Sequence, residues 1–502
     1  MTVILRRINY FIVLLFAFTF SCHDLAAQIL VWQPGQTNLT STPETEQPEV
    51  QLQLVLSVAS EPTPSLKYRF WESPAMRKRG SASEIMARAR HANLMLPNSA
   101  TLNQQYAKRA EYWQSECPLE ELAKSDLKEY LQAYSTVLKL VHAAMQCDTI
   151  TPERAIEFGG EQLWTLEDVL TDVQDCRHFA RLLVLESRLA IAEGRFDAAI
   201  ESLSIGFRLA EYCNQQHPMV VSKLVHLAIC GLMLDSLEKL SQHPQCPNLY
   251  WALASVPDSY WSNRLALDGE QVYQDRRLSP FLSPIGDDLS TEQLSERLVQ
   301  SLTIIPQVFE ATEDAMEQTQ VRLLAGAVLL LLTDKGREEL IDYGLSEQEV
   351  RQMSPSRVVI LSTQIGFSDV RDKIFKWTLL DTPDRIEQEL ELSKGPVSLL
   401  SPSRVILGMM LPAIQALQSA NLRTQTLHHR AMLVEALRAH AAAHENELPA
   451  SLETLSPLPA PMNPQTKNPF EYSRINTQEA IIRNQPMYPS DRQTETRVRI
   501  RT

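Results

Sequence analysis

Glycine is scarce in this chain, with 15 residues among 502. Few tight β-turns are therefore expected, because such turns depend on residues that tolerate a positive φ. The glycine-rich phosphate loops GxxxxGK[ST] and GxGxxG are absent, as are the GxSxG nucleophile elbow and the EF-hand loop. The common signatures of nucleotide-binding, acyl-transferring and calcium-binding proteins are thus missing.

Basic residues are also fewer than acidic residues in this chain. Lysine and arginine number 47 against 61 aspartate and glutamate residues, so the formal net charge is −14. An acidic surface repels phosphate backbones, and we interpret the short basic run Met76–Gly80 as a solvated face. Nucleic acid is therefore not expected as a partner.

No apolar run is long enough to span a bilayer comfortably, which takes about 20 residues. The run Ile8–Phe20 follows Arg6 and Arg7, as the apolar core of a secretory signal follows its positive segment. We therefore predict a signal peptide over 1–27 and an exported protein of the periplasm or cell envelope. A second run, Leu323–Asp334, is also too short to span and predicts a buried core helix.

Two processing sites compete after the N-terminal apolar run. Leu25 and Ala27 occupy the −3 and −1 positions of an ordinary signal-peptidase site, which favours cleavage before Gln28. Cys22 follows Ser21 in a degraded lipobox, so a lipid anchor on Cys22 is one alternative. An uncleaved anchor is the other, and either alternative would attach the N-terminus to a membrane.

Six cysteines remain after such cleavage, and none of them lies in a CxxC motif or a zinc-ribbon spacing. Export permits disulfides, and six cysteines allow 15 pairings that sequence alone does not resolve. Buried free thiols and one or two bridges both fit the pattern. The six are Cys117, Cys147, Cys176, Cys213, Cys230 and Cys246.

Composition divides the remaining chain. Residues 28–64 are rich in Thr, Pro, Gln and Ser and predict a flexible tether, with a weak strand signal at Leu52–Ser60. Helical periodicity then predicts a helical domain over 65–265 and a second helical region over 266–403. Hydrophobic residues make up 44% of the chain, enough to form real cores in these regions.

One helix pair over 180–212 stands out in the helical domain. Gly194 breaks the helical run, Phe196 packs into the turn, and Ala199 lets the two helices approach closely. This pattern of turn and contact residues resembles the helix–turn–helix unit of a tetratricopeptide (TPR) repeat. Only one unit matches, whereas a solenoid needs about three, so we expect a TPR-like hairpin within a larger array.

A long helical pattern, Val405–His444, is interrupted by Pro412 and leads into a proline-rich segment. We expect this helix and the residues after it to form a C-terminal module over 404–486. A tail, 487–502, follows.

Three short runs in this part predict strands. Phe470–Ile475 and Ala480–Arg483 alternate and predict a hairpin across the residues between them, and Thr496–Ile500 predicts a third strand. The fold class expected is therefore mainly α: an irregular helical array with a TPR-like helical hairpin, plus a small C-terminal β-element after a long helix.

The end of the long helix carries the one constellation that suggests a metal. His440 and His444 form a His-x-x-x-His pair, and His429 projects from the same side of the helix. His429 lies about 16 Å from His440 by helical rise, so one ion cannot bind both. The pair also lacks the internal glutamate of HExxH proteases. Leu433 and Leu437 lie on the same side of the helix, which favours imidazoles packed against apolar neighbours. No cofactor or metal is therefore expected. His440 and His444 are kept as weak candidates for metal binding.

The segments "ALRAHAAAHENELPASLETL" and "NPQTKNPFEYS" resemble the C-terminal part of the major pseudopilins of type II secretion. Relative to that pattern, Asn446 replaces the turn glycine, which a left-handed C-cap tolerates, and His440 replaces a tyrosine. Asn463 replaces an aspartate, which argues against a cation site there. The pseudopilin N-terminal cleavage motif is missing, so the resemblance implies a shared C-terminal module only.

The chain between about 60 and 485 resembles an uncharacterised family of large exported helical proteins from planctomycete-type bacteria. The resemblance rests on segments such as "PSLKYRF", "MQCDTI", "PNLYWALASVP" and "MLPAIQAL", and on the long segment over 180–210. It implies architecture and export, and it implies no reaction.

These observations predict a non-enzymatic exported scaffold or binding protein that contacts a protein or envelope partner. The alternative is a metal-dependent hydrolase centred on His440 and His444.

Overall fold

The computed structural model of the chain describes residues 50–96, 99–115, 117–150, 166–277, 283–286, 288–308, 318–378, 402–484 and 494–501. The expected signal peptide and its alternative processing sites lie outside these residues. The described chain is mostly helical with a small C-terminal sheet, which confirms the mainly α fold. Its described residues divide into two compact units: unit 1 lies within Asn263–Gln418, and unit 2 within 50–262 and 419–501.

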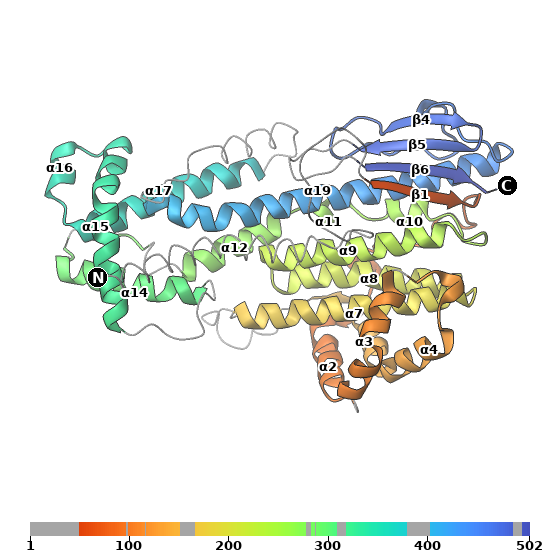
Figure 1. Ribbon diagram of the computed structural model, residues 1–502, viewed down its shortest axis with the longest axis horizontal. Coiled ribbons are helices and arrows are strands. Elements are labelled where there is room, and N and C mark those ends of the chain that lie inside the picture. Colours follow the sequence, from red (N-terminus) through yellow and green to blue (C-terminus); the bar gives the residue numbers. More distant parts are fainter. Residues whose placement is uncertain are drawn as a thin grey trace. The chain divides into compact units, whose positions relative to one another are not determined.

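Three consecutive helices form the centre of unit 2 (Figure 1): α7 (Leu166–Ala192), α8 (Phe196–Gln216) and α9 (Val220–Ser241). The turn between α7 and α8 places Gly194 at a φ of +75°, a conformation that glycine adopts without strain. The predicted helix pair is therefore confirmed, whereas its likeness to a TPR unit stays a prediction.

The helices of this layer approach one another closely. A Cβ atom on Gly206 of α8 would lie 2.1 Å from the Met233 sulfur of α9, so the Met233 side chain occupies the space that a larger residue at 206 would need. On the other side of α8, the Ser187 hydroxyl of α7 donates to the Ala199 carbonyl at 3.1 Å. Small residues at the contacts thus set the spacing of the layer.

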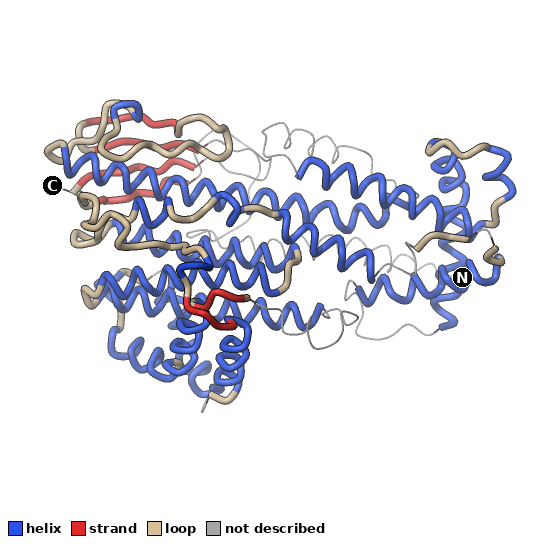
Figure 2. The backbone as a smooth tube through the Cα atoms, turned by 180° about the vertical axis from the view of Figure 1, so that it is seen from behind, coloured by secondary structure: helices blue, strands red, loops and turns tan. Residues whose placement is uncertain are grey.

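Shorter elements surround this layer, and α2 and α5 pack on each other. They are η1 (Pro74–Met76), β2 (Lys78–Ser81), α2 (Ala82–Leu94), α3 (Ser99–Ser115), η2 (Leu119–Glu121), α4 (Lys124–Ala133), α5 (Ser135–Met145), β3 (Cys147–Thr149), α10 (Tyr250–Ala254), α11 (Asp258–Trp261) and η3 (Leu452–Thr454). Strands β2 and β3 form a two-stranded parallel ladder, the smaller of the two red patches in Figure 2.

The second sheet of unit 2 has four strands in the order β1-β6-β5-β4 (Figure 1). Strands β4 (Glu471–Asn476) and β5 (Glu479–Asn484) form an antiparallel hairpin, and β6 (Thr494–Ile500) pairs antiparallel with β5. The predicted hairpin and third strand are thus confirmed.

The fourth strand, β1 (Val50–Leu56), corrects the prediction of a flexible tether over 28–64 for the part that the structure describes. It pairs in parallel with β6, with Leu54 opposite Val498. Leu54 and Leu56 are fully buried, because alternate residues of a strand face the same side of the sheet. The composition of the segment indicated a linker, but its partner strand lies at the other end of the chain.

Helix α19 (Pro402–Ala443) covers one face of this sheet with its second half. It continues through Pro412, where an interruption was predicted; one missing hydrogen bond does not end a helix this long. Leu433 and Leu437 pack against Leu54 and Val498. The C-terminal module is therefore not separate, since it shares a hydrophobic core with β1.

Unit 1 contains the remaining helices and the first part of α19. In its core, Leu298 of α14, Ala325 of α15 and Ile360 of α17 pack together. Gly336 of α15 lies against Val358 of α17, where an added Cβ would sit 3.1 Å from a valine methyl. The helices are α12 (Arg264–Arg277), α14 (Thr291–Val308), α15 (Gln318–Asp342), α16 (Glu347–Gln352) and α17 (Pro355–Thr378).

Candidate functional site

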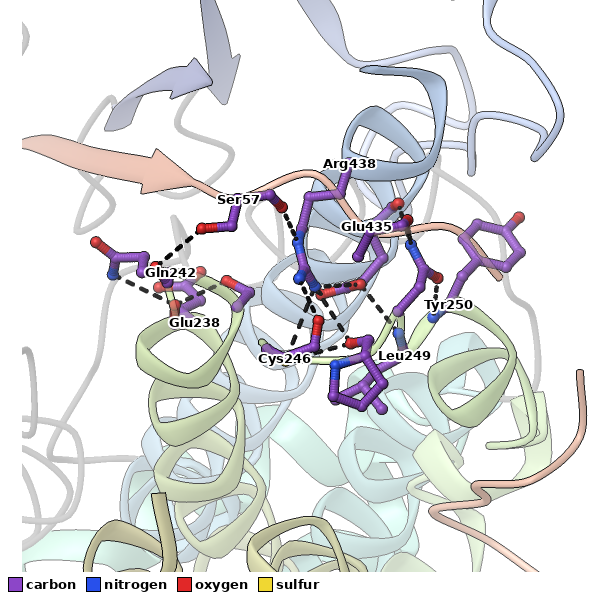
Figure 3. A network of polar contacts seen from close by, with 12 residues as sticks. Ser57, Glu238, Gln242, Cys246, Leu249, Tyr250, Glu435 and Arg438 are labelled. Carbon is purple, nitrogen blue, oxygen red and sulfur yellow. Dashed lines mark hydrogen bonds and ion pairs between the residues drawn. The ribbon is translucent and has the colours of Figure 1, made fainter. Parts of the chain in front are cut away.

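A buried polar network fixes the second half of α19 in unit 2 (Figure 3). The Arg438 guanidinium donates to both Glu435 carboxylate oxygens at 2.8 Å, to the Ser57 carbonyl at 2.8 Å and to the Cys246 carbonyl at 2.8 Å. The Leu249 amide donates to the same carboxylate at 3.0 Å. The network connects three segments: the end of β1, the loop that precedes α10, and helix α19. Its charged groups are hydrogen-bonded to other protein groups. We interpret it as structural.

The weak metal candidates, His440 and His444, lie beside this network. Their rings stack with centroids 3.9 Å apart and planes 15° apart. A metal ion lies in the plane of each imidazole that binds it, so two parallel stacked rings do not converge on one ion. The Nδ1 atom of His444 already donates to the His440 carbonyl at 2.9 Å, and Nδ1 of His440 accepts from the Ser456 amide at 3.2 Å.

The other histidines of α19 anchor segments of the chain. His428 Nε2 donates to the Leu253 carbonyl at 3.1 Å, and His429 Nδ1 donates to the Met462 carbonyl at 2.7 Å. Burial lowers the pKa of His428 to about 3, and burial also lowers the pKa values of His429 and His440. Neutral, hydrogen-bonded imidazoles therefore hold the loops around α19. Within the described residues, no group of three His, Cys, Asp or Glu side chains could hold a metal ion.

The turn after α19 follows the sequence expectation. Asn446 has a φ of 65°, which confirms its predicted left-handed cap, and Glu445 beside it has a φ of 49°. Asn463, which stands where the pseudopilin pattern has an aspartate, is buried, and its side-chain oxygen accepts from the Gln465 amide at 2.9 Å. Asn463 thus stabilises a turn of the loop.

An open groove of about 540 Å³ lies on the C-terminal module. Its walls are mostly apolar, and Met462 at its edge is half-exposed. Glu453 is the one charged side chain among the lining residues, and the groove contains no nucleophile activated by a base. Its other lining residues include Leu452, Leu455, Ala460, Phe470 and Tyr472.

Three exposed leucines lie in unit 1, where sequence predicted a buried helix at Leu323–Asp334. Leu323, Leu330 and Leu331 of α15 are 63%, 86% and 55% exposed. We call these three residues the α15 leucine face. The prediction was wrong because the apolar run of α15 extends around the helix, as in a buried helix, whereas among the described residues α14 and α17 pack against one side of it.

The opposite side of α15 shows how the face arises. Val321, Ala325 and Leu340 are buried and recur at helical spacing, and Leu323 and Leu330 project away from them because each residue advances about 100°. This spacing is visible in the sequence. It could have indicated two distinct faces, but not which one is covered.

Within the described part of the chain, α9 alone is long and apolar enough to cross a membrane. Its most apolar window is 78% buried inside the protein, as in a core helix, and it contains the buried Lys223. The length of this helix is therefore weak evidence for a span.

No protein-family model, no curated protein and no solved structure matches this chain. The resemblances to the exported helical family and to the pseudopilin module therefore stay predictions. The α15 leucine face is the candidate functional site.

Proposed function

We propose that the protein is an exported helical scaffold that binds a protein partner of the cell envelope through the α15 leucine face. The supporting observation is the exposure of three neighbouring leucines on one helix. Contiguous apolar side chains on a surface mark sites of association, since burying them removes apolar area from water.

The charges around the face favour a protein over an anionic lipid surface. Each basic side chain of α15 is paired with an acidic one: Arg322 with Glu296, Lys335 with Glu338, and Arg337 with Asp334. Binding to anionic lipid requires unpaired lysine and arginine, and the formal net charge of −14 opposes it. A protein interface combines an apolar centre with a polar, solvent-accessible rim.

Site-specific photocrosslinking in the native envelope tests the proposal. A photoreactive amino acid at position 330 should yield one discrete protein adduct, identified by mass spectrometry. The adduct should disappear with Leu323→Ser. The same photoreactive residue at Leu94 of α2, which is 79% exposed and lies in unit 2, is the matched control and should not yield that adduct.

The possible outcomes of the photocrosslinking experiment lead to different conclusions. A heterologous protein adduct specific to position 330 supports the scaffold function. Adducts to lipid alone, or equal adducts from both positions, would overturn it. A cross-link between two copies of this chain would show that the α15 leucine face mediates self-association and does not bind an envelope partner.

The alternative function is a metal-dependent hydrolase centred on His440 and His444. The stacked rings, whose planes do not converge on one ion, give this alternative no support. Stoichiometric zinc in the purified protein, lost in both His440→Ala and His444→Ala, would restore it.

Export itself rests on the N-terminal sequence. N-terminal sequencing of the mature protein should find Gln28 first, and a lipid on Cys22 or an intact N-terminus would indicate membrane attachment instead.

A further inference from the structure

The α7–α8 hairpin places two cysteines level with each other. Ser187 lies level with Ala199, and the Ser202 hydroxyl donates to the Glu186 carboxylate at 2.7 Å. Residues at equal distances before and after the Gly194 turn therefore lie at the same level, and Ser187 and Ser202 mark the sides on which α7 and α8 face each other.

Cys176 of α7 lies eleven residues, about three turns, before Ser187, and Cys213 of α8 lies eleven residues after Ser202, so both cysteines are on the facing sides of their helices. Both side chains are buried. The hydrogen bond to the Cys176 thiol and burial together raise the pKa of the Cys213 thiol well above its usual range. The Cys176 thiol thus lies within hydrogen-bonding reach of Cys213, whose sulfur also lies 3.7 Å from the Ser222 carbonyl of α9.

The hydrogen bonds of the other four described cysteines do not involve a second cysteine. The thiols of Cys117 and Cys147 donate to backbone carbonyls, at 3.4 Å and 3.5 Å. Cys230 lies 3.2 Å from the Tyr260 hydroxyl, and Cys246 lies beside Arg438. Of the 15 pairings that sequence allows, the fold therefore singles out one pair.

A disulfide between Cys176 and Cys213 is favoured over a metal ion bound by the two thiols. His217 Nε2 lies 2.6 Å from one oxygen of Asp172, the nearest carboxylate, and Arg90 binds the other oxygen. Both oxygens are engaged, and no three metal-binding side chains converge in the described residues.

We propose that Cys176 and Cys213 form a disulfide that ties α7 to α8 in the mature protein. Each thiol loses its proton, and the new sulfur–sulfur bond forms as two electrons pass to a disulfide-bonded oxidant, whose own bond breaks to give two thiols. The reaction takes place while the chain folds, because the folded hairpin buries both sulfurs. Inside cells the inference rests on the proposed export, which supplies an oxidising compartment.

The test uses the full chain in two arms. In the first, the protein is isolated from an exporting host and denatured with N-ethylmaleimide but without reductant. In the second, reduced unfolded protein is refolded in a glutathione buffer, where oxidised glutathione is the oxidant. Peptide mass spectrometry then finds the linked cysteines in both arms, and the N-terminal peptide shows whether the host exported the chain.

We expect a Cys176–Cys213 peptide in most molecules and free, alkylated Cys117, Cys147, Cys230 and Cys246. Cys213→Ala should abolish the link, whereas Cys230→Ala, the matched buried control on α9, should preserve it. Reduction should lower the melting temperature by about 5 °C, because the cross-link restricts the unfolded chain.

Two results would overturn the disulfide: both cysteines alkylated in the refolded protein, or a dominant link between any other pair. An intact N-terminus together with a reduced pair in cells, but a linked pair after refolding, would count against export and leave the disulfide standing. A zinc ion held by both thiols would replace the covalent bond.

Discussion

Arg438 and Glu435, one turn apart on α19, form an ion pair that water does not reach. Their side chains are 0% and 5% exposed, and one guanidinium nitrogen lies 2.8 Å from both carboxylate oxygens. The remaining guanidinium donors are bonded to the carbonyls of Ser57 and Cys246. One charged side chain thus connects the strand at one end of the chain with the helix near the other.

Arg438→Met should destabilise unit 2 by about 3–5 kcal/mol, because it leaves the Glu435 carboxylate buried without a counter-charge. Denaturant titration followed by tryptophan fluorescence measures this loss. Lys67→Met is the control. Its ion pair with Asp197 is exposed to solvent, so its loss should cost much less than the loss of the buried pair. Equal costs for the two variants would contradict a buried pair.

Lys223 of α9 should make stability rise with pH. Burial lowers its pKa to about 7, and its ammonium donates to the Tyr260 carbonyl at 2.9 Å. Between pH 7 and about 10 the unfolded chain binds a proton that the folded chain does not, so stability increases with pH by on the order of 4 kcal/mol in total.

Lys223→Met should remove this slope and should stabilise the protein at pH 6. Unfolding free energies at pH 6, 8 and 9.5 measure it. Lys239→Met, on the same helix in a less buried ion pair, should retain the slope. A slope that persists in Lys223→Met would show that another group titrates.

His428 should cause acid sensitivity. Burial lowers its pKa to about 3, so between pH 6.5 and 3 the unfolded state binds a proton that the folded state excludes. Stability then falls as the pH falls, by up to about 1.4 kcal/mol per pH unit. His428→Gln keeps a donor for the Leu253 carbonyl and should weaken this fall, whereas exposed His91→Gln should not. Thermal unfolding at pH 7, 6 and 4.5 distinguishes them.

Truncating two leucines of α15 to alanine should change the stability of the protein by very different amounts. Leu340→Ala should cost about 2–5 kcal/mol, because Leu340 is buried against Val350 and Val358. Leu330→Ala should change stability by less than about 0.5 kcal/mol, because Leu330 projects into solvent. Denaturant titration of both variants checks this. A large loss for Leu330→Ala would mean that the leucine face is covered within the protein.

The histidine pair should act through packing. His440→Ala should cost about 1–2 kcal/mol through loss of the contact with the Ser456 backbone, whereas exposed His444→Ala should cost less than about 0.5 kcal/mol. Zinc content, measured by atomic emission, should be the same in the parent and both variants. A stoichiometric ion lost from both would contradict this role.

Local chemistry explains which predictions succeeded. Gly194 marks the α7–α8 turn, Asn446 caps α19, and the alternation in 470–483 specifies a hairpin between neighbouring segments. Each of these signals depends on residues close together in the sequence. The candidate site was not predicted, because the unbroken apolar run of α15 does not reveal which side its neighbours leave exposed.

The sequence by itself determined the helical class, the hairpin around Gly194 and the cap at Asn446, because steric preference and hydrophobic period act over a few residues. Only the tertiary structure decided that β1 joins β6, that Arg438 is buried and that Cys176 faces Cys213. These relationships depend on the packing of distant segments, in which the burial of Leu54 against Val498 outweighs the linker-like composition around it.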